Sequence, residues 1–229
     1  MVYEVINTIY DISPGYWIEF LLEFIFAAVT FLVGLFSWKV YILTQKQQIK
    51  HFSFSFFFIS LGYLVQSVFN FLILFELKES LTDAFELFRL VIFDRLGLSI
   101  HIFMMITGLT LLLWMTLRTS AKSLWLLFAV SMVSLYFSTN KLYMFFILSS
   151  LYLAFITIYY VVNYFRKKQK NTFVIALAFI FLLIGRAHFI FIQNSALFFH
   201  IGHAFELIAY ALILLNFSII QHEQKKRPA

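Results

Sequence analysis

Seven long apolar runs restrict what this chain can fold into more than any other feature of its sequence. They cover residues 17–43, 52–75, 93–117, 123–137, 142–165, 172–192 and 197–220. A transmembrane helix needs about 20 mostly apolar residues, whereas a transmembrane strand needs about 10 residues of alternating polarity. The runs therefore predict an all-α, multi-pass membrane protein. Residues 1–229 form one seven-helix transmembrane domain, which ends in a basic tail at 221–229.

The fourth run is the weakest of the seven. About 18 residues separate Lys122 from Lys141, which is close to the lower limit for crossing a bilayer. This run is either a short and steep helix or one that does not cross fully.

Composition limits the classes of function. Of the 229 residues, 62% are apolar and only 12% are charged, which excludes a disordered chain and a nucleic-acid-binding protein. Because the chain has no cysteine, a disulfide scaffold, a thiolate metal site and a cysteine nucleophile are also excluded. Both prolines, Pro14 and Pro228, lie outside the apolar runs, so the broken helices of many transporters are not expected.

Lysine and arginine are distributed unevenly between the two sides of the predicted bundle. One side carries Lys39, Lys46, Lys50, Arg118, Lys122, Arg166, Lys167, Lys168, Lys170, Lys225, Lys226 and Arg227, and the other carries Lys78, Arg89, Arg95 and Lys141. Because basic residues are enriched in cytoplasmic loops, we predict that the N-terminus is outside and the C-terminus is cytoplasmic, in a protein of the cell membrane.

The longest connection, residues 76–92, alternates acidic with apolar residues. This spacing suits an amphipathic helix that lies on the outer surface or extends the third span outward, and a solvated connector is the alternative. Ser80 with Asp83 would cap the start of such a helix.

Polar residues inside the spans gather in the outer half of the membrane. Ionisable groups are costly in lipid and usually face the bundle interior, so their depth carries functional information. The candidate site residues are His101, His188, His200, His203, Arg186 and Glu206, and the supporting residues are Glu23, Gln66, Asn70 and Tyr210. The remaining histidines, His51 and His222, lie at the opposite boundary beside lysines, where an interfacial role is expected.

Helical geometry sorts these residues by face. At about 100° per residue, His203, Glu206 and Tyr210 share one face, whereas Arg186 and His188 are separated by about 200° and cannot both face one point.

A haem b between helices is the first hypothesis for this set. It needs an axial histidine from each of two helices, small residues at the porphyrin face and cationic groups near the propionates. His101 would be one axial ligand, with the small residues Gly97 and Gly108 on the same helix. His203 or His188 would be the opposite axial ligand. Arg95 or Arg186 would meet the propionates.

A transition metal is the second hypothesis, because imidazoles with a carboxylate suit Zn, Cu or Fe. The four outer histidines would be ligands, with Glu206 as a ligand or an orienting group. With one open coordination position, such a site would hydrolyse a lipid-like substrate. A structural or assembly subunit of a larger complex is the third reading.

The last apolar run contains the sequence His203, Ala204, Phe205, Glu206, Leu207, Ile208, Ala209, Tyr210. Together with the predicted topology, it resembles the seven-span sensor regions that precede histidine kinase or cyclic-dinucleotide domains in bacteria and archaea. The resemblance implies detection of a small ligand, redox state or cofactor within the membrane, with the signal carried by helix movement. Any output would require a separate partner chain.

The one-sided distribution of ionisable residues favours sensing, or local chemistry at the outer surface, over electron transfer across the whole membrane. We therefore expect a redox or sensory component of the lipid bilayer that holds haem b or a metal, rather than an enzyme.

Overall fold

The computed structural model describes residues 2–78, 84–118, 120–191 and 196–225, and its side chains over 17–76, 90–118, 120–191 and 197–220. The described residues form seven helices and no strand. The helices are α1 (Val2–Thr44), α2 (Gln47–Lys78), α3 (Ala84–Leu117), α4 (Ala121–Phe137), α5 (Lys141–Lys167), α6 (Lys170–Phe189) and α7 (Ala196–Lys225). The predicted all-α, seven-helix fold is confirmed.

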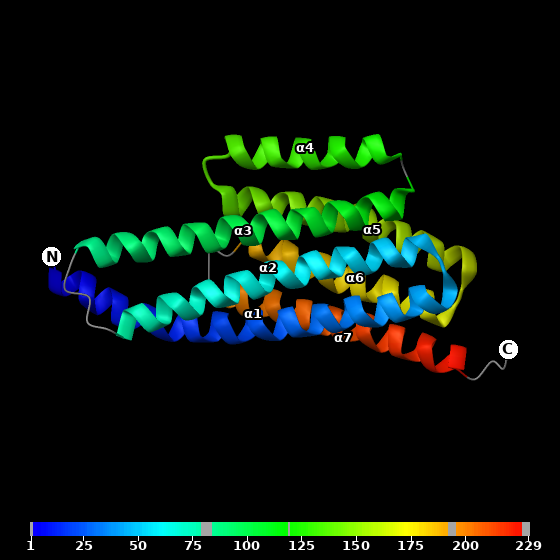
Figure 1. The fold of residues 1–229 in the computed structure, drawn as a ribbon, viewed down its shortest axis with the longest axis horizontal. Coiled ribbons are helices and arrows are strands. Elements are labelled where there is room, and N and C mark those ends of the chain that lie inside the picture. The colour runs from blue at the N-terminus through cyan, green and yellow to red at the C-terminus, as the bar shows by residue number, and fades with distance from the viewer. Residues whose placement is uncertain (1, 79–83, 119, 192–195, 226–229) are drawn as a thin grey trace.

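The helices pack as a ring of six with one helix outside (Figure 1). Each helix of the ring contacts the next in the order α1, α2, α3, α5, α6 and α7. Helix α7 also contacts α1 and so closes the ring. The remaining helix, α4, contacts only α3 and α5 closely. Successive helices alternate in direction, so the basic connections after α1, α3 and α5 gather at one end, which we call the basic end. The end that holds the N-terminus is called the N-terminal end.

Six of the helices are long and apolar enough to cross a membrane, and α4 is the exception. Its 17 residues reach about 25 Å, against a hydrocarbon core of about 30 Å. Because α3 ends at the basic end and α5 begins at the N-terminal end, α4 must still connect the two ends. The fourth run is therefore a short helix beside the bundle, in line with its weak sequence signal.

The connection predicted as amphipathic is in part an extension of the third span. Helix α3 already begins at Ala84, nine residues before the apolar run at 93–117. The capping pair Ser80 and Asp83 lies outside the described residues.

Three serines of α2 join this helix to α1 at intervals of one heptad. Each hydroxyl donates to a backbone carbonyl of α1: Ser53 to Gly34 (2.7 Å), Ser60 to Ala27 (2.8 Å) and Ser67 to Phe20 (3.2 Å). Both partners repeat every seven residues, which keeps one seam in contact along a pair of antiparallel helices. In a bilayer, where the hydrophobic effect does not drive helix association, such small polar contacts help to hold α1 against α2.

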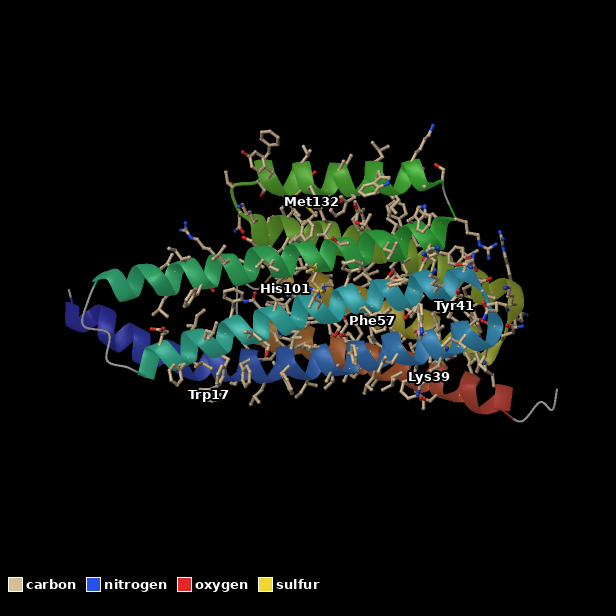
Figure 2. The ribbon with its side chains drawn as sticks, in the orientation of Figure 1. Trp17, Lys39, Tyr41, Phe57, His101 and Met132 are labelled. Carbon is tan, nitrogen blue, oxygen red and sulfur yellow. The ribbon has the colours of Figure 1, made fainter. Side chains whose placement is uncertain are left out.

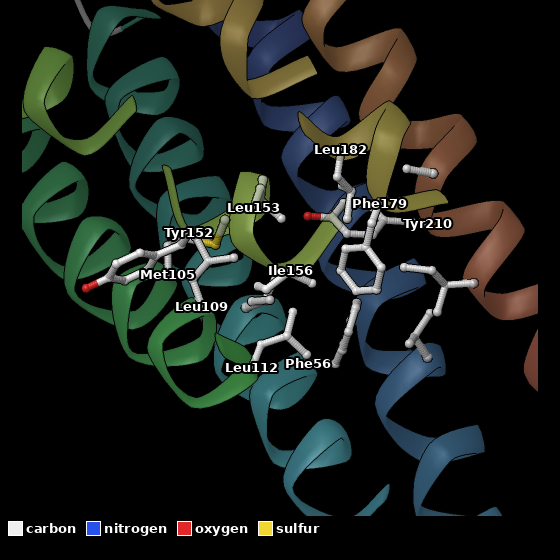
Figure 3. Close-up of a cluster of buried hydrophobic side chains, with 14 of the residues drawn as sticks. Phe56, Met105, Leu109, Leu112, Tyr152, Leu153, Ile156, Phe179, Leu182 and Tyr210 are labelled. Atoms are coloured by element: carbon white, nitrogen blue, oxygen red, sulfur yellow. The ribbon is translucent and has the colours of Figure 1, made fainter. Parts of the chain in front are cut away.

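Apolar side chains of α2, α3, α5 and α6 pack together in a core, and Figure 3 shows a cluster of them. Phe56, Ile106, Ile156 and Phe179 are fully buried there. Helix faces on the outside of the ring keep large apolar side chains exposed, which suits contact with lipid. This apolar core adjoins the polar residues described next, because Arg186 and Tyr210 line a small cavity together with Phe56 of the core.

Candidate functional site

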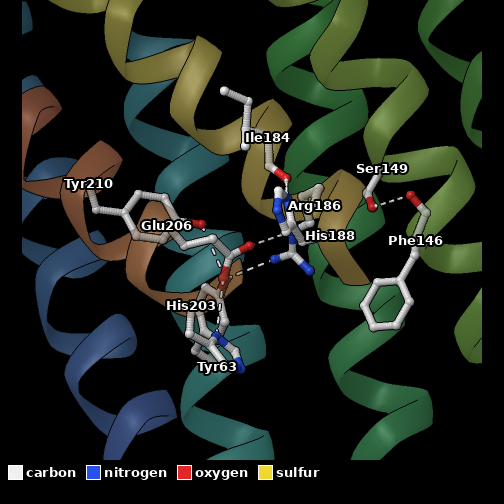
Figure 4. Close-up of polar contacts among 9 residues, drawn as sticks. All are labelled: Tyr63, Phe146, Ser149, Ile184, Arg186, His188, His203, Glu206 and Tyr210. Atoms are coloured by element: carbon white, nitrogen blue, oxygen red, sulfur yellow. Dashed lines mark hydrogen bonds and ion pairs between the residues drawn. The ribbon is translucent and has the colours of Figure 1, made fainter. Parts of the chain in front are cut away.

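A buried ion pair between α6 and α7 is the centre of the candidate site (Figure 4). The Nε atom of Arg186 lies 2.7 Å from Oε1 of Glu206, and neither side chain is more than 5% exposed. The guanidinium also lies over the rings of Phe145 and Phe189, 5.3 and 5.7 Å from their centroids. These rings shield the pair from solvent, and cation–π attraction adds to its stability.

Two tyrosine hydroxyls extend the polar contacts of this pair. Nη2 of Arg186 donates to the hydroxyl of Tyr63 on α2 (2.8 Å), and that hydroxyl donates to Oε2 of Glu206 (3.2 Å). The hydroxyls of Tyr63 and Tyr210 are 3.2 Å apart. Because the single proton of Tyr63 is engaged by Glu206, Tyr210 is the donor in this contact. The contacts thus connect α2, α6 and α7.

His203 is the fifth member of the group. Its Nδ1 atom lies 3.5 Å from Oε2 of Glu206, and its ring stacks on Phe26 of α1 at 5.3 Å. Two buried atoms, Nδ1 of His203 and Oε1 of Glu206, have no partner with hydrogen-bond geometry. We call Tyr63, Arg186, His203, Glu206 and Tyr210 the polar cluster.

Two glycines explain why Arg186 and Glu206 meet. A Cβ atom on Gly185 would lie 2.8 Å from the carbonyl oxygen of Gly202, and one on Gly202 would lie 3.1 Å from the carbonyl oxygen of Gly185. The missing side chains let the backbones of α6 and α7 approach closely, as small residues do at membrane helix crossings. Arg186 follows the first glycine directly, and Glu206 lies one turn after the second. The crossing therefore aligns the two charges.

The polar cluster also stands out by its burial. Among the described side chains, the buried acidic, basic and imidazole groups are Glu206, Arg186 and His101. Arg186 lies near the end of α6 and Glu206 near the start of α7, both toward the N-terminal end, and His101 lies on α3 (Figure 2).

His101 lies beside the polar cluster (Figure 2 labels it on α3). Its ring contacts the rings of Tyr63 and Phe145 at 5.5 and 5.9 Å between centroids. Its Nδ1 atom lies 3.0 Å from the carbonyl oxygen of Gly62 on α2. Because a carbonyl only accepts, Nδ1 is the donor, and Nε2 is left without a proton when the ring is neutral.

The other two candidate histidines lie apart from the polar cluster. Nδ1 of His188 lies 2.8 Å from the carbonyl oxygen of Ile184, and the ring packs on Phe198 and Phe205. His200 is exposed. The rotation between Arg186 and His188 thus separates them as the helical geometry predicts, with only the arginine in the polar cluster.

The supporting residues near the N-terminal end form a second, smaller group between α1 and α2. Nδ2 of Asn70 donates to Oε2 of Glu23 (2.8 Å), and Nε2 of Gln66 donates to Oδ1 of Asn70 (3.4 Å). Oε1 of Gln66 is buried without a hydrogen-bond partner. These three residues meet as a layer, but they do not contact the polar cluster through any described hydrogen bond.

The donor set gives limited support for a metal or haem. In the part of the chain that the structure describes, no three histidine, aspartate or glutamate side chains are placed to bind one metal ion. Gly97 and Gly108, expected beside a porphyrin, instead admit α2: a Cβ on Gly97 would lie 2.6 Å from Phe69, and one on Gly108 would lie 2.8 Å from the carbonyl oxygen of Ser55. These glycines serve helix packing.

The two arginines of the haem hypothesis and the boundary histidine His51 lie in different surroundings. Arg95 is exposed on α3, whereas Arg186 is engaged by Glu206. His51 packs on Trp114 near the basic end, 4.9 Å between centroids. His222 lies beyond the residues whose side chains are described.

Tyr63 is the member of the polar cluster that sequence reasoning missed. It precedes Gln66 and Asn70 by three and seven residues, so it shares their helical face. That spacing is the only signal that could have singled it out among 12 tyrosines.

The chain has no match among protein-family models, curated proteins or solved structures. No relative's ligand or activity therefore bears on this site, and its chemistry follows from its own residues.

Proposed function

We propose that the protein is a sensory component of the cell membrane and that the polar cluster is its switch. A small polar ligand or a change of protonation at the cluster alters the packing of α2, α6 and α7. The basic end faces the cytoplasm, in keeping with the bias of lysine and arginine toward cytoplasmic loops, and passes the change to a protein partner.

The observation that carries this proposal is the buried pair of Arg186 and Glu206. Ionisable groups within a membrane are expensive and tend to mark functional sites. A buried ion pair gives little stability that well-packed apolar residues would not also give. Packing alone therefore does not account for this pair, whereas a charge-sensitive element does.

Two features of the pair's surroundings suit a switch. The carboxylate of Glu206 lies between two basic side chains, with Nε of Arg186 2.7 Å from Oε1 and Nδ1 of His203 3.5 Å from Oε2, so a change in either neighbour acts on it directly. The hydroxyl of Tyr63 contacts Arg186, Glu206 and Tyr210 at once, so a change at Glu206 alters the contacts of three helices. Helices α6 and α7 then run without interruption to the basic end.

Distances between spin labels at the basic end test the proposal. Because the chain has no cysteine, Gln47→Cys on α2 and Ile219→Cys on α7 give one unique pair of labels. The substitution Glu206→Gln removes the charge and keeps an oxygen acceptor for Arg186. We expect it to shift the distance distribution by about 2 Å or more, the scale of helix movements in known switches.

Glu76→Gln is the matched control, because it removes a carboxylate near the end of α2, outside the polar cluster. It should leave the distribution unchanged. If Glu206→Gln also leaves it unchanged in a protein that unfolds cooperatively, the polar cluster is not a switch.

Cofactor binding through His101 and His203 is the second candidate. The observation that favours it is that Nδ1 of each ring lies near an oxygen, the carbonyl of Gly62 or the carboxylate of Glu206. Ligating histidines commonly use one ring nitrogen in this way and bind the metal through the other. Haem b or a transition metal ion would then set the state of the switch.

An absorption spectrum with elemental analysis of the purified protein tests this candidate. A Soret band that moves on reduction supports haem, and stoichiometric Zn, Cu or Fe without pigment supports a metal. His101→Ala and His203→Ala should each remove the cofactor, whereas His51→Ala and His222→Ala should retain it. Absence of both pigment and metal would leave the cofactor-free switch, or a role in assembly if the label distances also stay fixed.

A further inference from the structure

A groove lies between α4 and the ring of six helices, near the N-terminal end. It has a volume of about 190 Å³. Its walls include Ser99, Ile102 and Phe103 of α3, Met132 and Leu135 of α4, and Lys141 at the start of α5. The groove is thus mostly apolar, with the hydroxyls of Ser99 and Tyr136 and one cationic group, Lys141, in its lining.

The groove exists because α4 is held to the ring at few points. The hydroxyls of Ser131 and Tyr152 are hydrogen-bonded, and the hydroxyl of Tyr152 also donates to the carbonyl oxygen of Leu127 (3.2 Å). Figures 1 and 2 show α4 standing apart from the other helices, with Met132 on the side facing them. The outward side of α4 exposes Val130, Val133 and other apolar residues. An apolar groove bounded by such helices faces lipid tails rather than water.

The mouth of the groove favours a negative charge. Lys141 is exposed and makes no ion pair with any described residue. It is also the first residue of α5, where the positive end of the helix dipole adds to its charge. None of the described residues that line the groove is acidic.

We propose that this groove binds an anionic lipid, with one acyl chain between α3 and α4 and the headgroup phosphate beside Lys141. The apolar walls accept the acyl chain of a lipid with any headgroup. Lys141 provides the selectivity for an anionic headgroup. The site lies at the N-terminal end of the bundle, opposite the many lysines and arginines of the basic end. The proposal is independent of the switch in the polar cluster.

Native mass spectrometry of the full chain tests this assignment. The purified protein is supplied with equal amounts of phosphatidylglycerol and phosphatidylcholine that carry identical acyl chains. We expect one retained lipid with a preference of about five-fold for phosphatidylglycerol, which corresponds to about 1 kcal/mol for one lysine near the headgroups.

Three variants separate the groove from general attraction to charge. Lys141→Gln should reduce the preference for the anionic lipid to near unity without abolishing retention. Lys122→Gln removes a lysine at the other end of α4 and should leave the preference unchanged. Met132→Trp fills the groove and should remove the retained lipid of either class.

Three outcomes would overturn the proposal. Equal retention of the two lipids by the unmodified protein would exclude selectivity. A loss with Lys122→Gln as large as with Lys141→Gln would assign the effect to overall charge. Full retention in Met132→Trp, when this variant unfolds at the same temperature as the parent, would place the lipid elsewhere.

Discussion

At the scale of single residues, Arg186 and Glu206 are not equivalent partners. A carboxyl group that loses its partner can take up a proton and become neutral, whereas a guanidinium keeps its charge under all physiological conditions. The two side chains are nonetheless equally enclosed, by α2, α6 and α7 and by the rings of Phe145 and Phe189. Removing one partner should therefore have a different consequence from removing the other.

We predict that Glu206→Leu destabilises the protein by about 3–5 kcal/mol, because it leaves a permanent buried charge without its partner. Arg186→Met should cost less, since the remaining carboxyl can be neutralised. The double variant Arg186→Met/Glu206→Leu should recover most of the loss, because apolar residues of similar size replace the pair. Unfolding in mixed micelles with increasing denaturing detergent measures the free energies.

Equal losses in the two single variants, or a double variant no more stable than Glu206→Leu, would contradict this account. The same measurement on His200→Leu serves as a control, because His200 is exposed and lies apart from the polar cluster. That substitution should change the free energy of unfolding by less than about 0.5 kcal/mol.

Residue-scale prediction from the sequence was good where a charge lies in an apolar run. Arg186, Glu206 and His203 were predicted on this ground, and Tyr210 was predicted because it shares a helical face with His203 and Glu206. These four residues do meet. His188 and His200 were predicted on the same ground and lie apart, because depth alone does not specify which face of a helix turns inward. Tyr63 carries no charge, and so its depth gave no signal.

At the scale of helices, the crossing of α6 and α7 depends on the absence of two side chains. The contacts that a Cβ on Gly185 would make include the carbonyl oxygen of Gly202 at 2.8 Å and Cγ of Glu206 at 3.1 Å. A backbone carbonyl cannot move aside as the end of a flexible side chain can. The two helices would have to separate, and the ion pair would lengthen with them.

We predict that Gly185→Ala destabilises the protein by about 1–3 kcal/mol, the usual range for overpacking. Gly62→Ala is the matched control, because a Cβ there meets mainly side-chain atoms, Cγ of Met105 at 3.2 Å and Cβ of Met104 at 3.3 Å. It should cost clearly less. Thermal unfolding followed by circular dichroism compares the two, and an equal cost would show that close approach of backbones is not the limiting factor.

The heptad of serines on α2 belongs to the same scale. Ser53, Ser60 and Ser67 are visible in the sequence, but a serine inside a membrane helix usually bonds to the carbonyl four residues earlier, as Ser55 does with His51. Only the position of α1 turns these three hydroxyls into contacts between helices.

At the scale of the whole molecule, the ring of six helices with α4 outside gives the protein two chemically different ends. The connections at the basic end carry Lys46, Arg118 and Lys168. The connection between α4 and α5 at the other end, residues 138–140, contains no lysine or arginine. Basic residues favour the cytoplasmic side of a membrane, so the basic end is expected inside.

We predict that a cysteine at Thr139, between α4 and α5, reacts with a membrane-impermeant maleimide in intact cells. A cysteine at Gln169, between α5 and α6, should react only after the cells are permeabilised. Both positions are exposed, and the chain has no other cysteine to react. The reverse pattern would invert the orientation and place the polar cluster on the cytoplasmic side.

The sequence by itself determined the helical membrane fold, the approximate bounds of the helices, the weakness of the fourth segment and the layer in which the polar residues lie. These follow from local quantities, namely the length and polarity of each run, since a bilayer leaves backbone polar groups no partners outside the helix. Only the tertiary structure decided that α4 stays outside the ring, that Gly185 and Gly202 bring α6 to α7, and that Tyr63 completes the polar cluster. Those outcomes depend on which faces of different helices meet, and the period of a single helix does not contain that information.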